Sequence, residues 1–219
     1  MSVADDIPVR RMDFEFPDDT DLVFIEGDPG LSYFFVGAWM MLPYLEPFLI
    51  RTVQAAVPLV NDEDLSQRMT RFCAQEGQHF RQHARLNAVV RRMHPSGPRL
   101  AELEAQVEAE FAGWSADKPL KFNLAYGEGF ESMTCAGART QIQIGMFGWM
   151  KEPIRSLMYW HILEEIEHRT VCFDVYEKVV GDYFYRTRMS LWFDPGRVRL
   201  PAGFEDARQD FTARAVSVQ

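Results

Sequence analysis

The segment from His161 to His168 carries side chains that can bind a metal ion. His161, Glu165 and His168 are spaced at i, i+4 and i+7, so a helix would present all three on one face. Two imidazoles and a carboxylate on one face can act as ligands without any distortion of the backbone. A hydrogen-bonded core histidine is the alternative role for His161. Glu164 points about 100° away from this face, where it could orient a ligand imidazole.

A second segment repeats part of this pattern. Glu76 and His79 are spaced at i and i+3, as Glu165 and His168 are, and such helical neighbours can bind one ion of a two-metal centre. One Glu-x-x-His pair is usually a solvated or ion-paired feature, but two pairs on separate long helices are harder to explain in that way. His83 lies one turn beyond His79, and we expect it to orient other groups or to lie at the surface.

Two further predicted helices each carry glutamate within an apolar stretch. Glu46 is the candidate on the first, and Glu128 and Glu131 are alternatives on the other. Burying four carboxylates without cations would be very unfavourable, whereas two divalent ions offset much of their charge. A glutamate from each of two helices, with Glu-x-x-His from each of two others, is the ligand pattern of dinuclear carboxylate bundles. The sequence therefore predicts a two-metal site.

Helical periodicity, broken by prolines and glycines, predicts the elements that hold these residues. Pro43 and Pro47 should divide an apolar stretch over residues 31–50 into two helical pieces. Four long helices, one shorter amphipathic helix and no strong strand pattern predict an all-α bundle with a crossover helix. After residue 50, with Asn61 as the first N-cap, the predicted helices span about residues 61–94, 99–114, 119–148 and 153–181.

The same pattern divides the chain into three parts. We expect an arm at residues 1–30, the bundle with its metal site at residues 31–181, and a tail packed on the bundle at residues 182–219. Residues 31–50 are long enough to cross a bilayer, but their two prolines and Glu46 argue against an integral membrane protein. The N-terminus lacks the apolar region of a secretory signal.

The composition is that of an ordinary globular protein. The 219 residues are 47% apolar and 25% charged. A net charge of −9 argues against nonspecific binding to nucleic acid, which requires a basic face. The three cysteines form no Cys-x-x-Cys pair, which indicates buried thiols in a reducing compartment. We therefore expect a cytoplasmic protein.

Three motifs resemble those of a bacterial family labelled predicted metal-dependent hydrolases. The most specific is Trp-His-Ile-Leu-Glu-Glu-Ile-Glu-His at residues 160–168, followed by Cys-Phe-Asp-Val-Tyr at residues 172–176. Residues 72–87 resemble the second motif of that family, and residues 43–53 resemble the first. The family is similar in ligand pattern to ferritin-like di-iron proteins. The His-x-x-x-Glu-x-x-His helix is similar to that of the arylamine N-oxygenases, in which the extra histidine is a ligand.

The resemblance implies a ferritin-like four-helix bundle and a set of metal ligands. The implied ligands are Glu46, Glu76, His79, Glu128, His161, Glu165 and His168. The chain departs from the family on the third long helix, where the family tends to show an apolar residue, Glu, His and Phe. This chain has Gly-Glu-Gly-Phe-Glu at residues 127–131, and the glycines loosen the helix. Glu131 therefore competes for the ligand role, and we expect Glu128 to hold it.

Three hypotheses about function follow. The leading one is an enzyme with two iron ions that activates O2 to oxidise or oxygenate a small organic substrate, with electrons from a reductase. Manganese, mixed manganese and iron, or zinc are the alternative metals. The second hypothesis is a dinuclear metal-dependent hydrolase, and the third is a non-enzymatic ferritin-like metal-binding protein. The amphipathic helix over residues 100–111 could pair with a second copy to form a homodimer.

Overall fold

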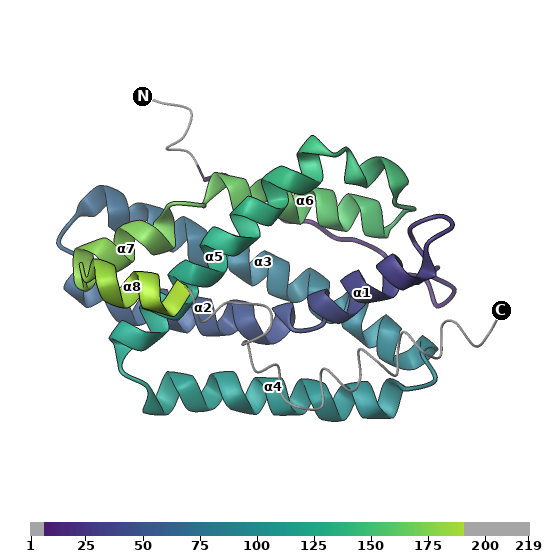
Figure 1. The fold of residues 1–219 in the computed structure, drawn as a ribbon, viewed down its shortest axis with the longest axis horizontal. Helices are drawn as coiled ribbons and strands as arrows, with labels where there is room; N and C mark the ends of the chain where they lie inside the picture. Colours follow the sequence, from purple (N-terminus) through teal and green to yellow (C-terminus); the bar gives the residue numbers. More distant parts are fainter. Residues whose placement is uncertain (1–6, 191–219) are drawn as a thin grey trace.

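The computed structural model describes residues 7–190, which form an all-α fold, as predicted (Figure 1). Within these residues the only β-type pairing is a single bridge between Ile25 and Met150. The α-helices are α1 (Pro29–Trp39), α2 (Leu42–Ala56), α3 (Glu63–Met93), α4 (Gly97–Asp117), α5 (Leu120–Gln143), α6 (Ile154–Glu167), α7 (Val171–Val179) and α8 (Tyr183–Ser190). Short 3-10 turns occupy Val57–Leu59 and Met146–Trp149.

The apolar stretch after residue 30 is divided into two helices, as its prolines predict. Pro43 lies in the first turn of α2, where the missing N–H costs no intrahelical hydrogen bond, and Pro47 lies inside the same helix. By length and composition, Pro29–Leu59 could cross a membrane. Half of its most apolar window is buried inside the protein, however, and core helices of soluble proteins pass the same test. The packed core therefore accounts for this stretch.

The long helix α3 begins one residue later than the sequence predicts. Its N-cap is Asp62 and not Asn61, because Asp62 Oδ1 accepts a 3.0 Å hydrogen bond from the Leu65 backbone N–H. The face of α3 that points into the fold is unusually polar. Its buried polar side chains are Gln75, Glu76, His79, Gln82, His83 and Asn87.

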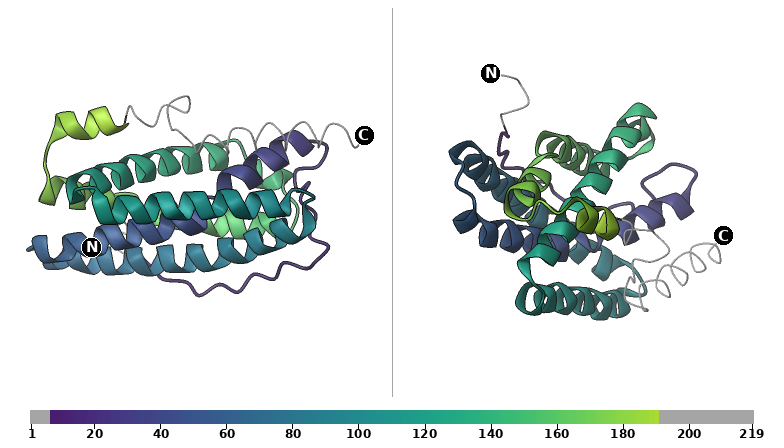
Figure 2. Two further views of the ribbon diagram at one scale, coloured as in Figure 1. Left: turned by 90° about the horizontal axis from the view of Figure 1, so that it is seen from below. Right: turned by 60° about the vertical axis from the view of Figure 1, so that its left-hand side comes forward.

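The crossover helix α4 packs across α2 and α3 on the outside of the fold (Figure 2). Its apolar side chains are buried, and the Phe111 ring lies 5.2 Å from the Phe48 ring of α2. Buried Glu104 accepts hydrogen bonds from Asn87 and Arg91 of α3. The apolar face of α4 is therefore occupied within the chain, and it lends no support to the expected homodimer.

The sequence predicts one long helix over residues 153–181. This prediction is wrong in one respect, because the chain forms two helices, α6 and α7, with a break at residues 168–170. His168 has left helical geometry, but its backbone N–H still bonds to the Glu164 carbonyl at 3.1 Å. It therefore stays above the same face as His161 and Glu165. The turn after the break lets Val171 and Val175 of α7 enter the core.

Gly181 marks the turn between α7 and the segment that follows it. Gly181 has a positive φ of 61°, which suits glycine after a helix C-terminus, and its N–H bonds to the Tyr176 carbonyl. Helix α8 then packs against α5. The rest of the predicted tail, residues 191–219, lies outside the described residues.

The N-terminal arm lies along the bundle, and we call residues 7–16 the strap. Its backbone pairs with Gln82 of α3, which accepts from the Phe14 N–H at 3.1 Å and donates to the Met12 carbonyl at 2.7 Å. The Phe14 ring lies 5.5 Å from the Trp160 ring of α6. The strap thus contacts both α3 and α6, the two helices that carry the Glu-x-x-His pairs.

Candidate metal centre

Four helices, α2, α3, α5 and α6, bring eight glutamate and histidine side chains together in the core. Each is exposed by 5% or less of its surface. They are Glu46 on α2, Glu76, His79 and His83 on α3, Glu131 on α5, and His161, Glu165 and His168 at α6. We refer to these residues as the eight-residue centre. It contains six of the seven implied ligands.

One end of the centre is built from three carboxylates and one imidazole. Glu76, Glu131, Glu165 and His168 each offer one ligand atom, and these atoms lie within 4.8 Å of one another. His168 Nε2 lies 3.3 Å from Glu76 Oε1 and 3.3 Å from Glu131 Oε2. This spacing is what several ligands of one cation require.

The other end contains more nitrogen. Glu46, Glu76 and His79 form one group within 4.8 Å, and His79, His161 and Glu165 form another. His79 Nδ1 lies 3.6 Å from Glu76 Oε1 and 3.6 Å from Glu165 Oε1. Glu76 and Glu165 belong to groups at both ends of the centre. They are therefore placed to be shared between two cations.

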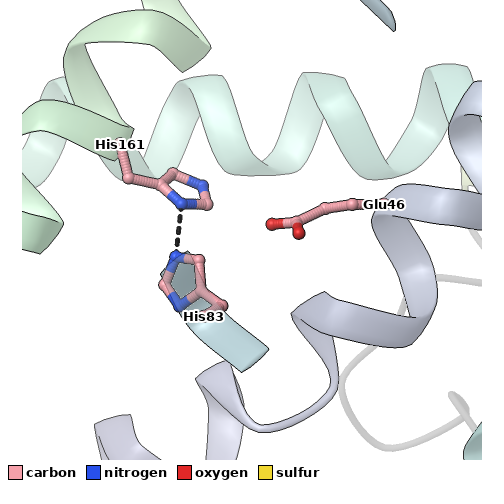
Figure 3. Close-up of side chains that lie close together, drawn as sticks. All are labelled: Glu46, His83 and His161. Atoms are coloured by element: carbon pink, nitrogen blue, oxygen red, sulfur yellow. Dashed lines mark hydrogen bonds between the residues drawn. The ribbon is translucent and has the colours of Figure 1, made fainter. Parts of the chain in front are cut away.

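His83 lies close to both His161 and Glu46 (Figure 3), and these three residues form a further group whose ligand atoms are within 4.8 Å of one another. His83 Nε2 lies 2.6 Å from His161 Nδ1, and this distance is that of a hydrogen bond in which one ring donates. His161 Nε2 lies 3.0 Å from Glu165 Oε1, on the side of the centre. If His161 Nδ1 is the donor, its Nε2 lone pair points at the centre. In that arrangement His83 would orient His161, and it would also remain near enough to Glu46 to share a cation with it.

Many polar atoms of the centre have no hydrogen-bond partner among the described residues. Such atoms are costly in a protein core, by about 1–3 kcal/mol each. They are both carboxylate oxygens of Glu46, one oxygen each of Glu76, Glu131 and Glu165, and His79 Nδ1, His83 Nδ1 and His168 Nε2. Because these atoms come together from α2, α3, α5 and α6, the residues fit a pair of bound cations.

Outer contacts fix the rings of two histidines. Glu164 Oε2 lies 3.1 Å from His79 Nε2, and Gln75 Oε1 lies 2.9 Å from His168 Nδ1. Each acceptor holds an N–H of its imidazole away from the centre, so the other ring nitrogen faces inward and can bind a cation once it carries no proton. The sequence predicted this kind of role for Glu164. It gave no signal for Gln75, because a buried glutamine has no distinctive spacing.

Without cations, the charge of the centre is reduced by bound protons. Burial and the charge of Glu76 raise the pKa of Glu46 well above its ordinary value. Burial and the nearby Glu165 raise the pKa of Glu131 to about 8. Burial alone would lower the pKa of His79, but its contacts with Glu164 and Glu76 raise this pKa to about 10. Glu131 and His79 therefore hold a proton at pH 7.

Metal uptake is accordingly expected to release protons. Carboxylate and imidazole ligands must lose their protons, so we expect on the order of two or more protons per chain at pH 7. Metal affinity should also rise as the pH increases through about 8, since Glu131 is then already deprotonated before the metal binds. Titration of metal-free protein with Mn²⁺ in weakly buffered indicator dye measures both effects. Uptake without proton release would contradict the protonation described above.

Glu128 does not lie in the centre, which corrects the expectation that ranked it before Glu131. Glu128 Oε1 accepts hydrogen bonds from Ser132 at 3.1 Å and from Arg186 of α8 at 3.2 Å. A guanidinium therefore compensates this carboxylate in place of a metal. Glu131, one turn later on α5, reaches the cluster.

The described residues thus combine an all-α fold with a buried cluster of carboxylates and histidines that could hold metal ions. The sequence model of a family described as "predicted metal-dependent hydrolase" matches residues 8–197, and the chain belongs to this family. No curated protein and no solved structure matches the chain.

Proposed function

We propose that the chain is an enzyme with a dinuclear metal centre. Glu76 and Glu165 would be shared by both ions. Glu46, His79 and His161 would complete one site, and Glu131 and His168 would complete the other. The observation that carries this proposal is the convergence of buried, unpartnered ligand atoms from α2, α3, α5 and α6. The ligand pattern is that of ferritin-like di-iron bundles.

One reaction that this set of ligands would suit is the oxidation of a small organic substrate by O2. Mixed carboxylate and imidazole ligands suit iron or manganese. A bound pair of iron ions would supply the reduction of O2, with electrons returned by a separate reductase. The residues around the centre would exclude water, because the Phe72 ring lies 4.8 Å from the His168 ring and the Trp160 ring lies 4.9 Å from the His79 ring.

Metal-dependent hydrolysis is the other candidate function, and it is the one that the family description supports. Two shared carboxylates could hold two ions around one water molecule and lower its pKa. In this case Glu131, whose pKa is raised to about 8 in the metal-free protein, would have to bind as the anion. Zinc or manganese would then support activity without O2.

One experiment separates these candidates. Metal-free protein is loaded with about two equivalents of Fe²⁺ per chain without O2, and O2 is then admitted while the near-ultraviolet absorption and the iron oxidation state are followed. The oxidase proposal expects rapid oxidation of both ions in wild-type protein and in Glu128→Gln, but not in Glu165→Ala. Slow oxidation no faster than free iron, together with esterase or phosphatase activity of the zinc form, would establish hydrolysis instead.

A further inference from the structure

The strap contributes no ligand, but its Arg10 contacts two residues close behind the centre. Arg10 Nη1 donates to Glu164 Oε1 at 2.9 Å and to Glu167 Oε2 at 2.8 Å. Arg10 Nη2 donates to Glu167 Oε1 at 2.7 Å, which completes a two-pronged pair with that carboxylate. Each of these carboxylates is connected by hydrogen bonds to a different histidine of the centre.

The first connection runs through Glu164 to His79. Glu164 has a fully buried side chain, and its two oxygens are contacted by Arg10, by Trp160 Nε1 at 2.8 Å and by His79 Nε2 at 3.1 Å. Arg10 is the fixed positive charge among these partners. It therefore allows a buried carboxylate to remain ionised and to accept the His79 N–H, which turns Nδ1 of that ring toward the centre.

The second connection runs through Gln75 to His168. Gln75 Nε2 donates to Glu167 Oε2 at 2.9 Å and to the Pro8 carbonyl of the strap at 2.9 Å. With both amide hydrogens held, Gln75 can present only its oxygen to His168 Nδ1. The His168 ring is thereby kept in the form whose Nε2 lone pair points at the centre. The strap supplies Pro8 directly and fixes Glu167 through Arg10.

We propose that Arg10 is a positioning residue of the metal centre, which sets the ring orientation of His79 through Glu164 and of His168 through Glu167 and Gln75. This inference rests on the proposed function, because it assumes that both histidines bind metal. An ordinary surface ion pair contributes little, and the Arg10 side chain is 41% exposed. The difference here is that Arg10 contacts a carboxylate with no exposed surface, which itself holds a ligand ring.

The neighbouring arginine provides a matched control. Arg11 lies in the same strap and carries the same charge, but its side chain is exposed. We therefore compare Arg10→Gln, Arg10→Lys and Arg11→Gln with the wild type in the full-length chain. The probe is Co²⁺, whose affinity is measured by competition with a chelator and whose visible absorption reports ligand geometry.

Arg10→Gln is expected to bind Co²⁺ about tenfold more weakly, the usual loss when an outer partner of a metal-bound histidine is removed. Its visible spectrum at saturating Co²⁺ should also shift, which a general loss of stability would not cause. Arg10→Lys keeps the positive charge but lacks the two-pronged guanidinium, so its Co²⁺ affinity should fall between those of Arg10→Gln and the wild type. Arg11→Gln should match the wild type.

Equal affinity and equal spectra for Arg10→Gln and Arg11→Gln would overturn the inference. If Arg10→Gln does not fold, Arg10→Lys decides by the same two readouts, and a lysine variant identical to the wild type in both would overturn it. Failure of the proposed function looks different, because the wild-type protein would then bind no Co²⁺ at the centre at all. In that event the inference falls with it.

Discussion

Replacing Glu131 with glutamine is expected to weaken binding of one of the two metal ions by at least about 100-fold. Loss of an outer partner alone costs roughly 10- to 100-fold, and Glu131 is placed as a ligand itself. The same substitution at Glu128, one turn earlier, should leave both affinities within about twofold of the wild type. Glu128 is compensated by Arg186 and Ser132, and glutamine can still accept their hydrogen bonds.

Metal content after dialysis and chelator competition with Mn²⁺ measure this difference. The two variants are closely matched, because both replace one carboxyl group by an amide in the same buried stretch of α5. If Glu128→Gln loses an ion and Glu131→Gln keeps both, the ligand on α5 is Glu128, as the resemblance implied, and α5 must be rotated in the metal-bound protein.

Replacing Glu46 with leucine is expected to stabilise the metal-free protein while it weakens metal binding. Neither oxygen of Glu46 has a hydrogen-bond partner among the described residues, and the side chain is 2% exposed. Such a carboxyl group costs about 1–3 kcal/mol, which a leucine of similar size would not. The free energy of unfolding in the presence of a chelator should therefore rise by about 1–3 kcal/mol. The further stabilisation that metal gives the wild type should shrink.

Urea unfolding with and without metal tests this expectation, and Glu104 supplies the control. Glu104 is also buried, but Asn87 and Arg91 hydrogen bond to it. Glu104→Leu leaves those donors unsatisfied and should destabilise the protein with or without metal. A metal-free Glu46→Leu protein that is less stable than the wild type would mean that the Glu46 carboxylate is satisfied in some other way.

The parts of the centre that the sequence predicts are those with a local pattern. Two Glu-x-x-His pairs and an extra histidine at helical spacing are visible within a few residues, and apolar neighbours mark Glu46 as buried. The division of the first apolar stretch into two helices follows from Pro43, because proline acts on its own backbone. The all-α class follows from the sum of such local signals.

The choice between Glu128 and Glu131 could not be made in this way. The two residues are three positions apart and lie on one face of α5, so their spacing does not show which of them faces the metal site. What separates them is Arg186, which lies 58 positions further along the chain and belongs to a segment with no clear pattern. The break between α6 and α7 was also missed, because residues 168–170 contain neither glycine nor proline.

The contacts of the strap are the clearest case of information absent from local sequence. Arg10 and Glu167 are 157 positions apart, and nothing near either residue indicates the other. Arginine in a charged arm is ordinarily solvated, so its sequence context predicts no particular partner. Only the packing of the arm across α3 and α6 makes Arg10 part of the environment of the centre.

The order of these groups along the chain has a consequence for biosynthesis. The strap is synthesised before its partners Glu164 and Glu167, which are on α6. The ligands of α3 likewise wait for His161, Glu165 and His168. A nascent chain that has not yet produced α6 therefore exposes acidic side chains without the imidazoles that complete the centre. If the centre binds metal as proposed, its set of ligands can be completed only after α6 has been synthesised.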